Sequence, residues 1–393
     1  MKRLLALLLL LILPASALAA DYCDCPDAAT HARRQEAMDR VLYAYQTMGA
    51  SIALVKDGRI IDTFQYGRAN RADNIPVDSD TYFRIASVTK MVSAVGILQL
   101  VEGGKLELDR DVGDYLPFTS VRNPYFPDTV ITLRQIMTHT ASLNDDYHYE
   151  RATGGDITPL NIIFEGNYKK ENFQRFEPGT RADYSNFGGG LLGSLLEQRT
   201  ANVIDEYMNW HVFQPLGFIA GYHTPTLPEG AKIARIYNIE STGMTLDPMS
   251  FTDYHMDPEP EYDYTHTAGA LCITAEGLAK VIIALAGDGS VDGVQILKPE
   301  TVQMMRTRQD NIGSVTCDSE RGLNLNIIED ALVQGRTLYG HQGKAYGMIC
   351  AAYFDPTDQT GVVLLTNGCD DSTFNSVARI ARSVLSKAYE YLE

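Results

Sequence analysis

The chain has 393 residues, of which 45% are hydrophobic and 21% charged, and its formal net charge is −17 at pH 7. So acidic a surface argues against nucleic acids and anionic membranes as partners, because both would repel it. The length is sufficient for two domains, or for one large domain with an inserted lobe.

The first twenty residues have the three parts of a secretory signal peptide. A charged start is followed by an apolar run over 4–13 and by the small-residue cleavage site Ala17-Leu18-Ala19. The apolar run is too short to span a bilayer, and no later segment reaches that length. Cys23 is not preceded by small residues, so we expect no lipid anchor. We therefore predict that 1–20 is a signal peptide and that the protein is secreted or periplasmic.

Six cysteines lie after the expected signal peptide, and an even number in an oxidising compartment predicts disulfides. Their pairing stays open, except that Cys350 and Cys369 flank one expected hairpin out of register and are poor partners. No C-x-x-C pair or clustered histidine accompanies them, so the sequence predicts neither a metal site nor a cofactor. The six are Cys23, Cys25, Cys272, Cys317, Cys350 and Cys369.

The first regular element that the sequence predicts is a β-hairpin. Its strands are the β-branched runs 51–55 and 59–66, and Asp57-Gly58 between them favours a turn that matches strand twist. An apolar helix is predicted over 87–101, with Gly103-Gly104 at its end. Apolar residues surround this helix on almost all sides, so we expect it to be buried in the centre of the protein.

The middle of the chain, about 106–269, alternates short helical segments with polar loops rich in Tyr and Pro. We interpret it as a mostly helical lobe inserted into a sheet subdomain made of about 45–105 and 270–393. The acidic segment 253–263 indicates a loop. Further helices are predicted over 133–138, 188–197, 203–213, 275–287 and 372–392, and further strands over 337–341, 347–354 and 360–367.

Three motifs, in this order, have the residues that acyl transfer through a serine ester needs. Ser87 and Lys90 lie three residues apart at the start of the predicted helix 87–101, so they share one face. Tyr184-Ser185-Asn186 lies between a Pro-Gly turn and the run Gly188-Gly189-Gly190, which lets backbone pack closely. His341-Gln342-Gly343 belongs to a predicted strand. A serine nucleophile requires a nearby base and donors for the developing oxyanion.

Each motif also has a structural alternative. Ser87 is a common type of helix-capping residue, Tyr184 is a common packed aromatic, and a histidine on a strand such as His341 is often structural. The second Y-x-N match, Tyr207-Met208-Asn209, lies in a helical stretch and indicates a core or surface aromatic. We expect His139 to fix a loop rather than to take part in catalysis.

From about Arg34 onward the sequence resembles the serine β-lactamase-like, penicillin-binding-protein-like superfamily. The likeness is greatest to the class C branch with its esterase and D-aminopeptidase relatives. The resemblance implies an α/β (α+β) fold, with a five-stranded antiparallel sheet flanked by helices, a mostly helical lobe, and the site between them. The segments that carry it are Phe83-Arg84-Ile85-Ala86-Ser87-Val88-Thr89-Lys90, 131–140, Phe176-Glu177-Pro178-Gly179, Tyr184-Ser185-Asn186 and Gly340-His341-Gln342-Gly343.

The resemblance also implies a role for each motif residue. Ser87 would be the acylated nucleophile, Lys90 would tune proton transfer, and Tyr184 would act as general base and then as acid. Asn186 would hold the substrate and Lys90, and the backbone N–H groups of Ser87 and Lys344 would form the oxyanion hole. The partial positive charge of a helix N-terminus beside the serine, and the loss of proton affinity of a buried lysine, support these roles physically. Gly343 would let the substrate lie along the strand without meeting a Cβ.

Two departures from the family pattern narrow the expected substrate. Penicillin-recognising members usually carry Lys where this chain has His341, and that cation helps to hold a carboxylate. Lys344 cannot replace it, because side chains alternate along a strand and Lys344 faces away. A neutral histidine weakens carboxylate recognition, so we expect an ester, amide or peptide without a carboxylate there. The usual His-Thr-Ser-Gly is also altered, to His139-Thr140-Ala141-Ser142.

These observations predict an exported serine hydrolase, an esterase or a peptidase/amidase in preference to a β-lactamase. The sequence leaves open a β-lactamase or D,D-carboxypeptidase, and also a non-catalytic binding or sensor protein of the same fold. If the substrate carries a free amine, Asp145, Asp146 or the acids near Asp257 are candidates to receive it. The loops 144–172 and 241–265 are expected to shape the pocket, and the oligomeric state is open.

Overall fold

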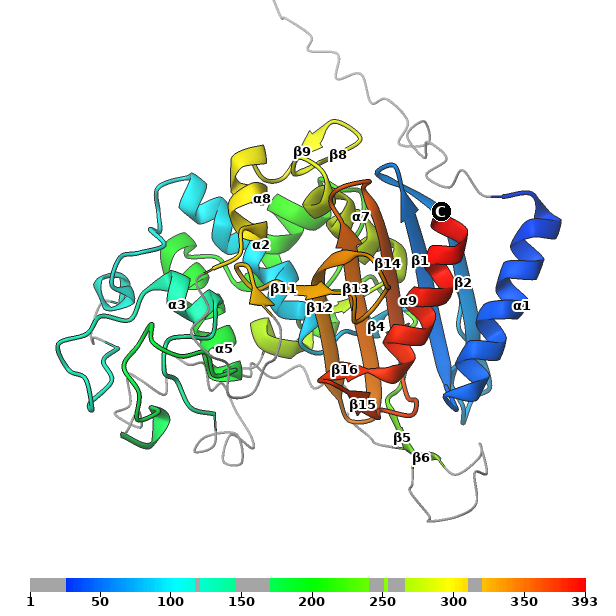
Figure 1. Cartoon of the computed structure of the whole chain (residues 1–393), viewed down its shortest axis with the longest axis horizontal. Helices are drawn as coiled ribbons and strands as arrows, with labels where there is room; N and C mark the ends of the chain where they lie inside the picture. Colours follow the sequence, from blue (N-terminus) through cyan, green and yellow to red (C-terminus); the bar gives the residue numbers. More distant parts are fainter. Residues whose placement is uncertain (1–25, 117–120, 146–169, 240–250, 254–265, 310–319) are drawn as a thin grey trace, which may run out of the picture.

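An antiparallel sheet of eight strands runs through the protein in the order β10-β11-β12-β13-β14-β1-β2-β3 (Figure 1). The computed structural model of the chain describes residues 26–116, 121–145, 170–239, 251–253, 266–309 and 320–393. The five long strands are β1 (Gly49–Lys56), β2 (Arg59–Asn70), β12 (Thr337–Ala345), β13 (Met348–Asp355) and β14 (Thr360–Thr366). The short strands β3 (Ile75–Pro76), β10 (Glu320–Arg321) and β11 (Asn326–Glu329) extend its edges beyond the five strands that we expected.

Helices cover both faces of this sheet (Figure 1). The helices α1 (Ala28–Ala44) and α9 (Arg379–Leu392) lie on one face, and α7 (Ala275–Ala286) lies on the other, beside α2 (Val88–Glu102). Alternation along β1 explains the arrangement: Ile52 and Leu54 pack with α1 and α9, whereas Ala53 and Val55 join the core on the side of α7. The central strands are therefore buried on both faces.

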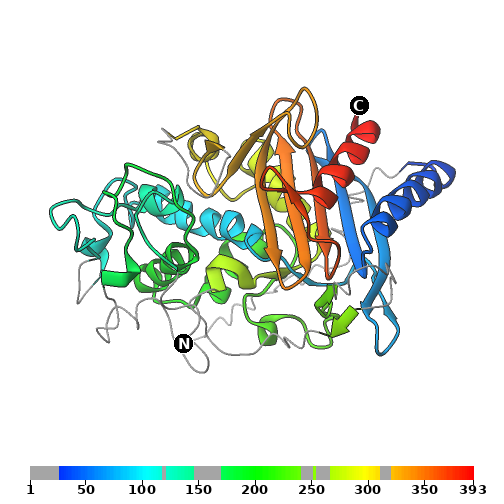
Figure 2. The ribbon, with the colours of Figure 1, turned by 60° about the horizontal axis from the view of Figure 1, so that its bottom comes forward.

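The helix α2 is the centre of the molecule, as its apolar sequence predicts (Figure 2). Twelve of its 15 residues are buried. It packs against α5 (Asn186–Thr200), α6 (Ile204–Met208) and the strand β12. Its N-terminus therefore lies where the sheet meets the helices from the middle of the chain.

The middle of the chain supplies mainly short elements. They are η1 (Val112–Tyr115), α3 (Leu133–Met137), η2 (Lys170–Asn172), η3 (Asn209–Phe213), η4 (Thr224–Thr226), η5 (His266–Ala270) and the pair β5 (Tyr237–Ile239) and β6 (Phe251–Asp253). The predicted helix over 203–213 is divided into α6 and η3. The remaining elements are β4 (Phe83–Arg84) with β7 (Cys272–Ile273), β8 (Ser290–Val291) with β9 (Val294–Gln295), α8 (Pro299–Arg306), and β15 (Thr373–Phe374) with β16 (Val377–Ala378).

Some predicted elements require correction. The last helix begins at Arg379 rather than at Ser372, because 373–374 and 377–378 pair as a hairpin before it. Phe374, which lies within the predicted helix 372–392, is 53% exposed. The helix α1 was not predicted, since Met38 and Leu42 are its only buried residues and its apolar pattern is sparse.

The expected disulfides do not hold for the three cysteines that the structure describes. Cys272, Cys350 and Cys369 are buried free thiols, and burial raises the pKa of each to about 12. The other three cysteines lie outside the described residues, as do the predicted signal peptide and most of the loops 144–172 and 241–265. Within the described ranges, no helix is both long and apolar enough to cross a membrane.

Candidate active site

The backbone before Ser87 forms a strained turn that presents the serine at the start of α2. Ala86 has φ +45°, in the left-handed region that residues with a Cβ rarely adopt. The backbone hydrogen bonds that hold this turn run from Ile85 N–H to the Leu271 carbonyl at 3.0 Å, from Val88 N–H to the Ile85 carbonyl at 3.2 Å and from Thr89 N–H to the Ala86 carbonyl at 2.9 Å. The Ser87 hydroxyl makes no capping hydrogen bond and is partly exposed. It is therefore available for chemistry, unlike that of an ordinary capping serine.

Lys90 places a buried amine beside this hydroxyl. The side chain is only 1% exposed, and its Nζ lies 3.4 Å from Ser87 Oγ. The same nitrogen donates to Asn186 Oδ1 and to the Ala268 carbonyl, both at 2.7 Å. Thus the S-x-x-K and Y-x-N segments meet at one amine, through the contact between Asn186 and Lys90 that the resemblance implies.

The surroundings of Lys90 weaken its hold on a proton. Burial lowers the pKa of Lys90 to about 7, and the nearby Arg321 lowers it too, whereas the Asp145 carboxylate opposes the shift. Near neutral pH a substantial fraction of the amine is unprotonated and can accept a proton. This agrees with the physical argument made from the sequence.

The glycine run of α5 makes the room that Lys90 occupies. A Cβ at Gly189 would lie 2.9 Å from Lys90 Cε and 3.1 Å from Ala268 Cβ, and one at Gly193 would lie 2.4 Å from Thr267. Either contact would force α5 away from its neighbours. The prediction that the run Gly188-Gly189-Gly190 permits close packing is confirmed at Gly189, and Gly193 adds a close approach that was not predicted.

Tyr184 lies among four basic side chains from four different parts of the chain. Lys90 Nζ is 4.8 Å and Arg321 Cζ 5.9 Å from the centroid of its ring. The rings of His139 and His341 lie 4.3 and 6.4 Å away, measured between centroids. Cations at such distances favour a negatively charged phenolate over a neutral phenol.

The two histidines are neutral and are protonated on opposite nitrogens. His139 Nδ1 accepts a hydrogen bond from Ser185 N–H at 3.2 Å, so its proton is on Nε2. His341 Nδ1 lies 2.6 Å from the Gln342 carbonyl and must donate, so its Nε2 is an acceptor. Burial holds the pKa of His139 well below its ordinary value and lowers that of His341 to about 3. His139 fixes the backbone before α5, as the sequence predicted.

Asp145 fixes the Y-x-N segment at the N-terminus of α5. Its two oxygens accept hydrogen bonds from the Ser185 hydroxyl, the backbone N–H and side-chain amide of Asn186, and the Phe187 N–H, at 2.7–3.0 Å. A carboxylate is favourable at a helix N-terminus. Because both oxygens are occupied, Asp145 is not the receiver of a substrate amine that we had considered; Asp146 and Asp257 lie outside the described residues.

Gly343 brings the strand β12 against the nucleophile turn. A Cβ at this position would lie 2.4 Å from the Ile85 carbonyl oxygen and 3.1 Å from the Ser87 nitrogen. The residue is therefore needed for the chain's own packing, and the space that it leaves for a substrate stays a prediction.

The side chains that follow His341 alternate as predicted. Gln342 donates to the Ser376 carbonyl, and Lys344 Nζ lies 2.9 Å from a carboxylate oxygen of Asp371, so both point away from the site. The strand β12 pairs with β11 only as far as Gly340, and from His341 onward that edge has no strand partner among the described residues. An extended substrate could pair with it.

Other sequence features lie outside this site. Tyr207, the second Y-x-N tyrosine, is a buried core residue of α6, as expected. Ser142, where the resemblance expects glycine, has φ +54° and accepts a hydrogen bond from Asn123 Nδ2 at 2.8 Å. Among the described residues no group of three or more His, Cys, Asp or Glu side chains could hold a metal ion.

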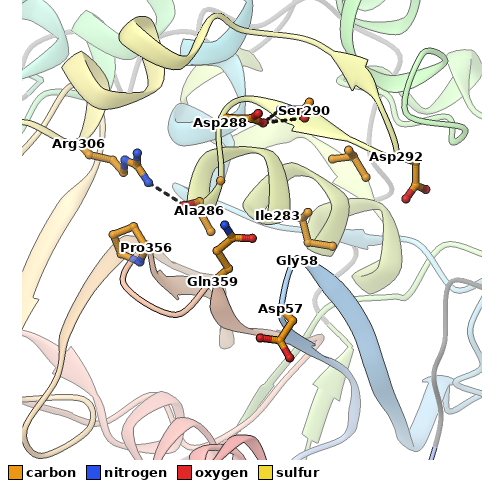
Figure 3. Close-up of a pocket in the computed structure, with 12 residues that line it drawn as sticks. Asp57, Gly58, Ile283, Ala286, Asp288, Ser290, Asp292, Arg306, Pro356 and Gln359 are labelled. Atoms are coloured by element: carbon orange, nitrogen blue, oxygen red, sulfur yellow. Dashed lines mark hydrogen bonds between the residues drawn. The ribbon is translucent and has the colours of Figure 1, made fainter.

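A surface pocket lies away from these residues, between the β1–β2 turn, the end of α7 and the β13–β14 turn (Figure 3). Arg306 lies at one side of it and donates to the Ala286 carbonyl at 2.7 Å. None of the motif residues lines it, so we do not place the chemistry there. Its lining includes Asp57, Gly58, Ile283, Asp288, Ser290, Asp292, Pro356 and Gln359.

The chain is similar to known proteins over most of its length. The sequence pattern described as Beta-lactamase matches residues 31–385. Penicillin-binding protein 4 of Amycolatopsis lactamdurans is 28% identical over 345 residues, which are 86% of this chain and 85% of that protein. Esterase EstB of Burkholderia gladioli is 31% identical over 203 residues, 49% of this chain and 51% of that protein.

The fold also matches that of a solved hydrolase. D-amino acid amidase from Ochrobactrum anthropi SV3, complexed with L-phenylalanine amide, has a TM-score of 0.72 at 21% identity, over 92% of this chain and 98% of that chain. The expected fold class and superfamily are confirmed. The chain belongs to the β-lactamase family, a family of serine hydrolases that contains esterases, amidases and penicillin-binding proteins.

Proposed function

We propose that this protein hydrolyses an ester, amide or peptide through an acyl-enzyme on Ser87. The observation that carries the proposal is the buried Lys90 amine, 3.4 Å from the Ser87 hydroxyl and with a pKa of about 7. An amine that exchanges its proton near neutral pH, beside a serine, is the means by which a weak nucleophile is activated.

The reaction has two halves. In the first, Ser87 Oγ attacks the substrate carbonyl while its proton passes to the Tyr184–Lys90 pair. The bond from the carbonyl carbon to the leaving oxygen or nitrogen then breaks, and Tyr184 returns the proton to that leaving group. In the second half, water attacks the carbonyl carbon of the acyl-enzyme while its proton passes to the same pair. The bond from that carbon to Ser87 Oγ then breaks, the proton returns to Ser87 Oγ, and the acid is released.

The substrate would lie between Asn186 and the open edge of β12. Asn186 Nδ2 donates to Asp145 while its Oδ1 accepts from Lys90, so the side chain is fixed at one wall of the site. His341 and Gly343 belong to the opposite wall. The backbone N–H groups of Ser87 and Lys344 are our candidates for the oxyanion hole, beside the positive end of α2.

His341 makes substrates without a carboxylate at this position the favoured class. Its ring is neutral, and its Nε2 is a hydrogen-bond acceptor. An acceptor repels a carboxylate but can receive an N–H or O–H group. We therefore favour an esterase or an amidase, and the similarity to an esterase supports this choice.

The second candidate is a β-lactamase or D,D-carboxypeptidase. The similarity to a penicillin-binding protein over 86% of the chain favours it. A non-catalytic binding or sensor protein is the third. The Ser87 hydroxyl that does not cap its helix and the lowered pKa of Lys90 argue against it, because a binding protein needs neither.

The test is a comparison of substrates with matched serine variants. Hydrolysis of p-nitrophenyl butyrate, a D-amino acid p-nitroanilide and a chromogenic cephalosporin is measured for the wild type, Ser87→Ala and Ser93→Ala. Ser93 lies on the same helix, but its hydroxyl contacts Tyr222 at 2.9 Å. We expect ester or amide turnover that Ser87→Ala abolishes and Ser93→Ala retains. Cephalosporin turnover above ester and amide turnover would favour the second candidate, and turnover that persists in Ser87→Ala would refute the proposal.

We also propose that the chain is exported and that 1–20 is removed. The support for export is the sequence pattern of residues 1–20 alone. The protein purified from a secreting host should have the mass of the chain without its first twenty residues. A purified chain that retains Met1 would contradict export by this route.

A further inference from the structure

Arg321 is a buried cation beside the site to which neither the motifs nor the resemblance assigns a role. It ends the short strand β10 and is 3% exposed. One amino group of its guanidinium donates to Asn326 Oδ1 at 3.3 Å, whereas the Nε–H is buried and has no acceptor in the part of the chain that the structure describes. The guanidinium carbon lies 5.9 Å from the centroid of the Tyr184 ring.

A buried guanidinium ordinarily has a carboxylate partner, because an unpaired charge is costly away from water. Even Arg336, which is only partly buried, has such partners in the same protein: it lies 3.0 Å from Asp355 and 2.7 Å from Asp358. Arg321 forms no ion pair with a carboxylate among the described residues. The group that it faces instead is Tyr184, which supplies a negative charge when its phenol ionises.

We propose that Arg321 is a positioning residue that favours the phenolate form of Tyr184. It acts through the face of the ring, without touching the substrate. The inference rests on the proposed function, in which Tyr184 receives the proton of Ser87. It adds a residue to that function and gives the ionisation of Tyr184 a physical cause.

The other groups around Tyr184 leave this role to Arg321. The histidines on the loop after α3 and on β12 are held neutral by burial, which lowers the pKa of each. Lys90 on α2 loses its charge near pH 7. Asp145 is hydrogen-bonded to the start of α5 and contributes the opposite charge. Above neutral pH, Arg321 is therefore the remaining cation among the described groups that face Tyr184.

The effect of Arg321 on its neighbours has the same sign. Its charge is one of the causes that lower the pKa of Lys90, His139 and His341. A field that disfavours protons on these three bases also favours loss of the proton from the tyrosine among them. One side chain thereby acts on every titratable group of the candidate proton-transfer path.

The direct test is the ionisation of Tyr184, followed by NMR of the full-length protein labelled with 13Cζ-tyrosine. The signal is assigned with Tyr184→Phe and titrated in the wild type and in Arg321→Met. The Arg336→Met variant is the control, because Arg336 stacks 4.7 Å from the ring centroid of Tyr389, outside the site. We expect Arg321→Met to raise the pH at which Tyr184 ionises by about one to three units and Arg336→Met to leave it unchanged.

Two results would overturn the proposal. One is an unchanged ionisation of Tyr184 in folded Arg321→Met. The other is a wild-type Tyr184 that ionises no lower than free tyrosine. If Arg321→Met does not fold, Arg321→Gln retains a donor for Asn326, removes the charge and permits the same comparison.

Kinetics separate this inference from the proposed function. On a substrate with Ser87-dependent turnover, Arg321→Met should lower kcat at pH 7 about tenfold or more, which corresponds to one unit of displaced ionisation. The loss should diminish at higher pH, and KM should change little. If Arg321 had only a structural role, Arg321→Met would lower the melting temperature and leave the pH dependence of kcat unchanged. Absence of any Ser87-dependent turnover would count against the proposed function, while the NMR titration would still decide the role of Arg321.

Discussion

Lys90 Nζ donates a hydrogen bond of 2.7 Å to Asn186 Oδ1, and this bond joins the start of α2 to the start of α5. The two residues are 96 positions apart in the chain. Asn186 is held in turn by Asp145, through both its backbone and its side chain. Lys90, Asn186 and Asp145 therefore form one hydrogen-bond network. A substitution at Asp145 should alter the environment of Lys90 through Asn186.

The first prediction concerns the pH dependence of activity. Lys90 has a pKa of about 7, and below that pH it carries a proton and cannot accept another. Turnover of a Ser87-dependent substrate should therefore rise as the pH increases through about 7. The measurement is kcat/KM between pH 5 and 9. An activity that is constant from pH 5 to 8 would contradict the role of Lys90.

The second prediction concerns stability. The folded pKa of Lys90 is about 7, against 10.5 for an ordinary lysine, so between these values the unfolded chain binds more protons. Stability of the wild type should then rise with pH in this window, relative to Lys90→Met, by up to about 1.4 kcal/mol per pH unit. Urea unfolding of both proteins at pH 7.5, 8.5 and 9.5 measures it. If the difference in unfolding free energy between the two proteins stays constant with pH, the pKa of Lys90 is not lowered in the folded protein.

The third prediction concerns Asp145. The change Asp145→Asn replaces two acceptor oxygens with one and sets an NH2 group against N–H donors. We expect a loss of about 1 to 3 kcal/mol of unfolding free energy and a lower kcat. Because the carboxylate raises the pKa of Lys90, the acid limb of the pH profile should also move to lower pH. The control is Asp109→Asn, whose partner is the partly exposed Arg134. A shift of the acid limb to higher pH would contradict the influence of Asp145 on the pKa of Lys90.

The sequence predicted the parts of the site that depend on local spacing. Ser87 and Lys90 share a helix face because they are three residues apart on a long apolar helix, and this geometry needs no tertiary information. The flanking turn and glycines of Tyr184 distinguish it from the second Y-x-N match at Tyr207. The structure agrees, since Tyr184 lies beside Lys90 and Tyr207 is in the core.

The rest of the site depends on long-range packing. Arg321 lies on a strand of two residues whose neighbours give no motif, and it reaches Tyr184 only through sheet pairing. Asp145 lies 41 positions before the Asn186 that it fixes, and its sequence neighbours do not indicate a helix cap. The packing role of Gly343 was not predicted, because its contact is with the backbone of Ile85, 258 positions earlier.

The fourth prediction follows from that contact. A Cβ in Gly343→Ala would collide with the Ile85 carbonyl and approach the Ser87 nitrogen. The strand β12 would then move away from the nucleophile, and a shift of about 1 Å lowers turnover by about a hundredfold. The matched control is Gly103→Ala, where the nearest atom would be 3.4 Å away. Equal activity of the two variants would contradict the placement of β12.

The fifth prediction concerns substrate selection by His341. The change His341→Lys puts a cation where the chain has a neutral acceptor, so lactam turnover relative to ester turnover should rise about tenfold. Gln342→Lys is the control, because that side chain points to Ser376 on the other side of the strand. The ratio of the two kcat/KM values is measured for each variant. A ratio that rises equally in both variants would indicate general charge rather than position.

The most direct test of the central claim is to trap the acyl-enzyme. The wild type and Ser87→Ala are incubated with a fluorophosphonate ester and with a slowly hydrolysed activated ester, and the adduct is located by peptide mass spectrometry. We predict one covalent adduct per chain, on Ser87, which is absent from Ser87→Ala and forms more slowly below pH 7. An adduct on another residue, or one that persists in Ser87→Ala, would contradict the assignment of Ser87 as the nucleophile.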